Sequence, residues 1–121
     1  MLAQKYTIDL HRGNSASDDE PPNHGDEPTG TITLLDYLDP RESRQLRADL
    51  KDALETGCRV WEFNLDRLES CDASTLGIFL GTHATLKKRA GKLILNVKPN
   101  SPVHRLLTLS RLDLVLSVNP F

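Results

Sequence analysis

Apolar and polar residues alternate in four short stretches of this chain, with the period of two that is typical of half-buried strands. In the first stretch, Tyr6, Ile8 and Leu10 are separated by polar residues. In the third, Trp61 and Phe63 have the same spacing, and we expect Trp61 to lie in the core. The four predicted strands are Lys5–Leu10, Thr31–Leu38, Cys58–Leu65 and Lys92–Val97.

The segment between the second and third strands has the start, the periodicity and the end of a helix. Asp39 is a suitable N-cap, Pro40 fits the first helical position, and Glu42 stands at the acidic position of a capping box. Gly57 is a suitable terminator. The apolar stripe that should face the core consists of Leu46, Leu50, Ala53 and Leu54.

A second helix is predicted over residues 73–90. It follows Asp72, has cations in its last turn, where the helix dipole favours them, and stops at Gly91. We expect Phe79 and Leu80 to be core residues and His83 to lie at the surface or edge. The residues assigned to one side of this helix are Leu76, Phe79, Leu80, His83, Leu86 and Lys87.

A short third helix is predicted near the end of the chain, with Ser101 as its cap and Pro102 as its first residue. The apolar segment "RLDLVLSV" after it is either a strand or an extended tail. Helices that alternate with strands imply mostly parallel pairing and right-handed crossovers. We therefore predict a single α/β domain over residues 1–121, with a mixed sheet of about five strands and helices packed against it.

The segment "HRGNSASDDEPPNHGDEPTG", residues 11–30, contains no apolar anchor. It is rich in glycine, proline and acidic residues, and burial cannot offset the entropy of ordering it. We predict a mobile loop here. Its composition favours a simple tether over a functional element, although a functional role is also open.

Composition excludes several classes of function. The net charge is −2 and no basic patch stands out, so nucleic acid is not an expected partner. No apolar run approaches the roughly 18–20 residues that cross a bilayer, so direct membrane insertion is not expected. The first residues, "MLAQKYTIDL", lack the apolar region of a secretory signal. These features predict a cytoplasmic protein.

The sequence indicates no metal, no cofactor and no enzymatic activity. Cys58 and Cys71 lack metal-ligand spacing and are predicted to be small core or half-buried residues. The four histidines are scattered rather than paired at ligand spacing. We find no nucleophile–base pair, no paired carboxylates and no phosphate-binding glycine loop.

Several motifs follow one another in the order that one family would require. Asp72, Leu76 and Gly77 open a helix, and "KKRAGKLIL", "SPVHRLL" and "RLDLVL" come after it. This succession resembles a STAS domain, the fold of bacterial anti-sigma factor antagonists, in which Asp-Ser-Ser/Thr-Gly-Leu-Gly opens the second helix. The resemblance covers about residues 31–118 and includes the first strand. It implies the STAS fold and a non-catalytic protein-interaction module.

The chain departs from the family pattern at three positions. Ala73 stands where phosphorylated antagonists carry the modified serine, and Ser74 matches the family's next residue. Thr75 replaces the usual glycine, and Asn64 stands where a strand aspartate is common. The resemblance therefore implies the fold, but it does not imply the standard phosphorylation switch.

Two interpretations of Asp72-Ala73-Ser74-Thr75 remain open. The first is helix capping alone, because Asp72 can satisfy one or two of the free N–H groups at the helix start. The second is regulated phosphorylation at Ser74 or Thr75. A phosphate there would gain about 0.3–1 kcal/mol from the helix dipole, and its charge would disrupt a contact surface.

The resemblance implies two alternative functions. One is an anti-sigma factor antagonist in a partner-switching pathway of transcription regulation, which binds an anti-sigma factor or a GHKL-type serine kinase. The other is a soluble STAS subunit that binds the ATPase of an ABC-type lipid transporter, which Ala73 favours because such subunits do not need the phosphorylated serine. The expected partner-binding residues are Asp36, Tyr37, Asp39, Asp72, Ala73, Ser74, Thr75, Leu76 and Gly77.

Overall fold

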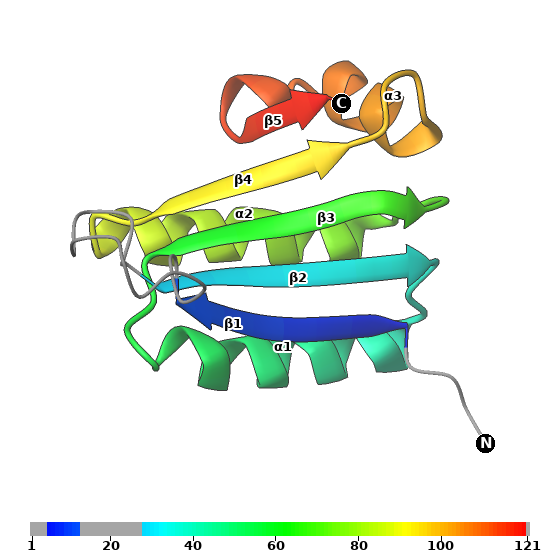
Figure 1. Ribbon diagram of the computed structural model, residues 1–121. Coiled ribbons are helices and arrows are strands. Elements are labelled where there is room, and N and C mark those ends of the chain that lie inside the picture. Colours follow the sequence, from blue (N-terminus) through cyan, green and yellow to red (C-terminus); the bar gives the residue numbers. More distant parts are fainter. Residues whose placement is uncertain (1–4, 13–27, 121) are drawn as a thin grey trace, which may run out of the picture.

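A five-stranded sheet with helices packed behind it forms the molecule in the computed structural model, which describes residues 5–12 and 28–120 (Figure 1). The strand order is β1-β2-β3-β4-β5, with β1 antiparallel to β2 and the other neighbours parallel. The predicted α/β class and mixed sheet are confirmed. The elements are β1 (Tyr6–Arg12), β2 (Pro28–Asp36), α1 (Pro40–Leu54), β3 (Val60–Leu68), α2 (Ala73–Lys88), β4 (Lys92–Val97), α3 (Pro102–Leu109), the 3-10 helix η2 (Leu112–Leu114) and β5 (Ser117–Pro120).

Most of the core lies between the sheet and helices α1 and α2, and Val103 and Leu107 of α3 belong to the same buried cluster. Trp61 and Phe63 of β3 are fully buried, as their alternation predicts. The ring of Phe63 meets that of Phe79 from α2 edge-on, with the ring centroids 4.9 Å apart. From α1, Leu46 and Leu50 are buried on the same side. The apolar stripes of strand and helix therefore meet as the sequence predicts.

The other face of the sheet faces the viewer in Figure 1, with α1 and α2 behind it. Its side chains are mostly polar, among them Thr31, Glu62 and Asn64. Asn64, Asn96 and Asn119 are paired across β3, β4 and β5 in one row. The Asn119 amide donates to the Asn96 Oδ1 atom at 3.1 Å, and the Asn96 amide donates to Glu62 Oε1 at 2.8 Å. These hydrogen bonds satisfy side chains that would otherwise lower the stability of a half-buried face.

Strand pairing extends into the segment that was predicted to be a loop over residues 11–30. β1 continues to Arg12 and β2 begins at Pro28, and these two residues are paired. The loop prediction is wrong at both ends, and its middle, residues 13–27, lies outside the described residues. Within this extension Gly30 lies against the Trp61 ring, where a Cβ atom would come within 2.2 Å of the indole. The tryptophan therefore requires glycine at that position.

The carboxyl ends of β2 and β3 also differ from the prediction. β2 ends at Asp36 rather than Leu38, because the chain turns there with a positive φ of 55° at Asp36. β3 continues to Leu68 instead of ending at Leu65, because Leu68 still pairs with Asp36 across a register shift in β2.

The rotation of α2 differs from the sequence prediction. Leu80 is 37% exposed instead of lying in the core, whereas Phe79 and Leu86 are buried as predicted. The buried face consists of Thr75, Ile78, Phe79, Thr82 and Leu86. Nearly all residues of this helix before its last turn are uncharged, so the hydrophobic pattern does not fix which side faces inward. Packing against the sheet and α1 decides it.

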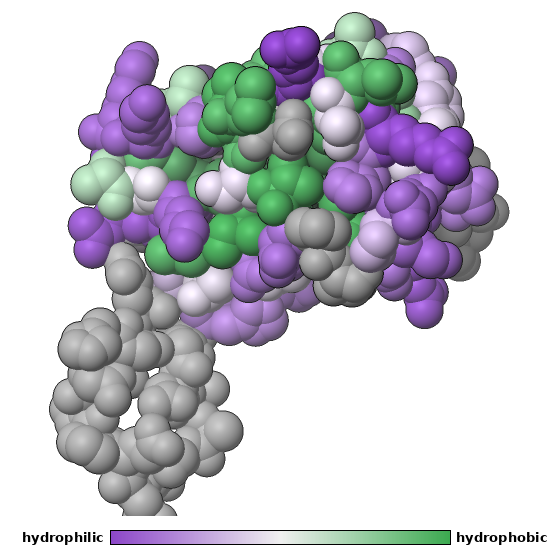
Figure 2. Space-filling view, turned by 90° about the horizontal axis from the view of Figure 1, so that it is seen from above, coloured by the Kyte–Doolittle hydropathy of each residue, from purple (hydrophilic) through white to green (hydrophobic). Residues whose placement is uncertain are grey.

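The C-terminal segment folds along the β4 edge of the sheet. Ser101 caps α3 as predicted, with its hydroxyl accepting from the His104 N–H at 3.1 Å. The apolar segment whose form was left open forms η2 and then β5, which pairs with β4. Figure 2, viewed from this end, shows hydrophobic residues at the surface among polar ones. Leu109 and Leu114 are 82% and 75% exposed there.

Candidate functional site

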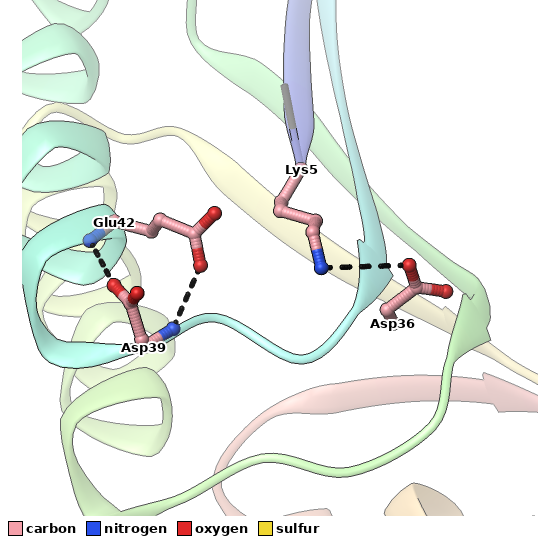
Figure 3. A network of polar contacts seen from close by, with 4 residues as sticks. All are labelled: Lys5, Asp36, Asp39 and Glu42. Carbon is pink, nitrogen blue, oxygen red and sulfur yellow. Dashed lines mark hydrogen bonds and ion pairs between the residues drawn. The ribbon is translucent and has the colours of Figure 1, made fainter. Parts of the chain in front are cut away.

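Two loops at the carboxyl end of the parallel strands are joined by main-chain hydrogen bonds. The Asp36 carbonyl, at the end of β2, accepts from the Glu69 N–H at 2.7 Å and from the Ser70 N–H at 3.3 Å, both just after β3. The Asp36 carboxylate is paired with Lys5 at 3.6 Å (Figure 3). These contacts fix the loop before α1 relative to the loop before α2.

The first of these loops ends in a complete capping box at α1. The Asp39 carboxylate accepts from the Glu42 N–H at 2.8 Å, and the Glu42 carboxylate accepts from the Asp39 N–H at 2.9 Å (Figure 3). The predicted cap is therefore confirmed. The contacts of Asp39 stay within the first turn of α1, so they do not link it to the start of α2.

The second loop ends at Asp72, the N-cap of α2. Its carboxylate accepts from the Thr75 N–H at 3.0 Å and from the Thr75 hydroxyl at 3.3 Å. The Tyr37 hydroxyl donates to the other carboxylate oxygen across a longer distance of 3.4 Å. The bond from the Thr75 N–H is the main cause that holds the pKa of Asp72 below its usual value. The Asp72 charge in turn raises the pKa of Tyr37.

The structure brings most of the predicted partner-binding residues to one surface. Tyr37 is 42% exposed beside Asp72, and Ala73 and Gly77 are exposed on the first turns of α2. Ser74 is half-buried, whereas Thr75 is only 1% exposed and its hydroxyl is bonded to Asp72. The exposure of the side chain therefore falls from Ala73 through Ser74 to Thr75. The reason is that successive residues of a helix are rotated by about 100° around its axis.

Arg47, an exposed residue of α1, also contacts this surface. Its guanidinium donates to the Ser74 carbonyl at 3.3 Å, which links α1 to the first turn of α2. The separation of 27 residues along the chain gives no local signal of this contact. Only the packing of the two helices side by side creates it.

This surface also includes one cysteine thiol. Cys71, next to the cap, is half-buried, and burial together with the Asp72 charge raises the pKa of its thiol to about 11. It is therefore a protonated thiol at neutral pH, which is a poor nucleophile. Within residues 5–12 and 28–120, no cluster of three or more histidine, cysteine or acidic residues is placed to hold a metal ion.

No helix in the described ranges combines the length and the apolar character needed to span a bilayer.

Comparisons with known proteins agree with this fold. A family model described as "Mlab, STAS domain" matches residues 25–117. The anti-sigma F factor antagonist of Paenibacillus polymyxa is 29% identical over 89 residues, which cover 72% of this chain and 74% of that protein.

Solved structures give the same result. The unphosphorylated form of SpoIIAA, an anti-sigma factor antagonist, has 30% identity and a TM-score of 0.65, with 74% of this chain and 78% of that chain covered. An anti-sigma factor antagonist from Mycobacterium paratuberculosis has a TM-score of 0.72 over 99% of this chain and 90% of that chain, and its 13% identity supports the fold alone.

The chain belongs to the STAS-domain family. It is a non-catalytic protein of the anti-sigma factor antagonist type, with homologues of that type in both sequence and structure.

Proposed function

We propose that this protein is a cytoplasmic regulator in a partner-switching pathway that binds an anti-sigma factor or a GHKL-type serine kinase through the start of α2. Binding sequesters that partner and releases the partner's own target. The observation that carries the proposal is the joined pair of loops, in which Tyr37 lies beside the Asp72 cap and next to exposed Ala73. A surface held in place by several hydrogen bonds loses little entropy when a partner binds.

Ser74 is the better candidate for phosphorylation than Thr75. The Ser74 side chain is half-exposed, whereas Thr75 is buried and bonded to Asp72. Arg47 lies against the Ser74 carbonyl, so a phosphate on this residue would have a guanidinium and the helix N-terminus as neighbours. Its charge would also weaken a protein contact made by the same turn.

Binding to the ATPase of an ABC-type lipid transporter is the second candidate. Two observations favour it. Ala73 cannot be phosphorylated at the position where antagonists carry their serine, and the matching family model is described as an Mlab STAS domain. In this case the same surface would bind the ATPase without any phosphorylation.

Affinity purification from the native host, followed by mass spectrometry, tests the proposal. Recovery of an anti-sigma factor or GHKL-type kinase supports the first function, and recovery of an ABC ATPase supports the second. We expect Ser74→Glu to weaken the complex that is recovered by tenfold or more, about 1.4 kcal/mol, because it places an acid in the contact turn.

Thr7→Glu is the matched control, since it adds the same charge at an exposed hydroxyl residue on β1. An unchanged complex in Ser74→Glu would contradict the proposed docking surface. Intact-mass measurement on the same preparations tests the phosphorylation itself, and the lack of any phosphorylated species under all growth conditions would overturn that part.

A further inference from the structure

A long groove runs between α1 and α2 on the side of the molecule away from the open sheet face. Its volume is about 430 Å³. Buried apolar side chains, among them Leu50, Leu54 and Ile78, form its floor. It extends along α1 from Arg47 to Glu55, which is roughly 12 Å at 1.5 Å per residue. A groove of this length has room for a row of side chains from another chain.

Two arginines bridge the helices, one at each end of the groove. At one end Arg47 of α1 donates to the Ser74 carbonyl of α2. At the other end Arg89, the residue that ends α2, donates to the Leu54 carbonyl of α1 at 2.6 Å. Both bonds lead to neutral carbonyl groups, so the positive charge of each guanidinium is not neutralised by them.

The rim of the groove has an excess of positive charge. It carries three cations, Arg47, Lys51 and Arg89, against the single carboxylate of Glu55. Among the residues that the structure describes, no carboxylate forms an ion pair with any of these three cations. A cationic rim above an apolar floor is complementary to a partner that is apolar on one side and acidic beside it.

One wall of the groove is lined by two glycines, Gly77 and Gly81, one helical turn apart on α2. A Cβ atom on Gly81 would meet nothing within 4 Å, and one on Gly77 would meet only the flexible end of Arg47 at 3.2 Å. The fold itself therefore requires neither glycine, although each lowers helix stability by roughly 0.5–1 kcal/mol relative to alanine. Their lack of side chains keeps the groove open and lets another backbone approach closely.

We propose that this groove is the docking site for an acidic amphipathic helix of a partner protein. Apolar side chains of that helix, at helical spacing, would lie over Leu50, Leu54 and Ile78, and its carboxylates would pair with the cationic rim. The inference rests on the proposed function only in taking the partner to be a protein. It extends the contact surface from the first turn of α2 along the whole helix.

The first test uses a synthetic helical peptide, so it does not depend on the identity of the partner. The peptide has about 18 residues, enough for measurable helix content, with glutamates on one side and leucine and alanine on the other. Its titration into ¹⁵N-labelled protein should shift the amide signals of Lys51, Gly77, Gly81 and Thr85. A second peptide with lysine in place of each glutamate should leave these signals unchanged. Equal shifts from both peptides, shifts confined to other surfaces, or no shifts would overturn the inference.

Variants of the full chain supply the second test. Gly81→Leu fills the groove and Lys51→Glu reverses one rim charge, and each should weaken binding of the glutamate peptide by about tenfold or more. The matched controls are Ala48→Leu, exposed on α1 outside the groove lining, and Arg105→Glu, exposed on α3. Binding that is equally weakened in the controls, or unchanged in the groove variants, would contradict the proposal.

The two proposals can fail separately. If the protein captured from its host binds its partner equally well with and without Gly81→Leu, the groove is not the docking site, yet Ser74→Glu still tests the start of α2. If no anti-sigma factor, GHKL-type kinase or ABC ATPase is recovered, the proposed function fails. The peptide titration still decides whether the groove accepts an acidic helix.

Discussion

Helices α1 and α2 pack side by side on the same sheet, but their outer faces differ in chemistry. The exposed side of α1 bears charges of both signs, including Arg44, Lys51 and Asp52. The exposed residues of α2 up to its last turn are all uncharged: Ala73, Gly77, Leu80, Gly81 and Ala84. A helix that is hydrophobic on all sides is usually covered on all sides. The contrast fits the proposal that a partner covers the outer side of α2, whereas α1 outside the groove lining is a solvated helix.

The contrast also has a thermodynamic side. Charged residues on α1 interact well with water and cost the fold little. On α2, small and apolar residues are exposed, and two of them are glycines that weaken the helix. Residues that the monomer does not need for its own stability are where a binding surface is expected. The following experiments test whether the two helices really share an equivalent inner face and differ only on the outer one.

The largest effect is expected for the inner faces. Leu46→Ala in α1 should lower the free energy of unfolding by about 2–5 kcal/mol, and Phe79→Ala in α2 by about 3–5 kcal/mol, because both side chains are fully buried and would leave cavities. Urea denaturation of each variant measures the change. Leu80→Ala is the control, and it should cost far less, since Leu80 is partly exposed. A loss as large as that of Leu46→Ala would show that the rotation of α2 is different.

A smaller effect is expected at the two helix starts. Asp39→Ala and Asp72→Ala should each lower stability by about 1 kcal/mol, since each removes an N-cap. The Asp72 effect should also depend on pH. The folded pKa of Asp72 is lowered, so its contribution is present above the unfolded value near 3.9 and is lost as the pH falls through the folded value.

Denaturation of wild type and Asp72→Ala between pH 7 and about pH 2 measures this dependence. The stability difference between them should be constant at neutral pH and should shrink on acidification. A difference that grows as the pH falls would mean that the Asp72 carboxylate is not stabilised by the Thr75 N–H.

The smallest effect, and the one with the opposite sign, is expected on the outer face of α2. Gly81→Ala should raise the free energy of unfolding by about 0.5–1 kcal/mol, because alanine favours the helix and the added methyl group points into open space. Thermal or urea unfolding measures the gain. Gly30→Ala is the contrasting variant, and it should destabilise the protein because the added Cβ atom would collide with Trp61. A destabilising Gly81→Ala would show that the fold itself requires this glycine.

The local features of the molecule were readable from the sequence because they depend on near neighbours in the chain. The capping box of Asp39 and Glu42, the Ser101 cap and the alternation of Trp61 and Phe63 all follow from spacing and side-chain chemistry over a few residues. The position of the start of α2, after Asp72, was predicted for the same reason. The mixed sheet followed from the order of the elements, because parallel strands need crossover helices.

Other features depended on contacts between distant parts of the chain, and only the tertiary structure decided them. The lengths of β1 and β2 follow from the pairing of these two strands with each other. The rotation of α2 follows from its packing, because its own residue pattern is apolar on nearly all sides. The contact of Arg47 with the Ser74 carbonyl and the groove between α1 and α2 arise in the same way. Sequence spacing can specify a helix and its cap, but a surface shared by two helices exists only once both are packed on the sheet.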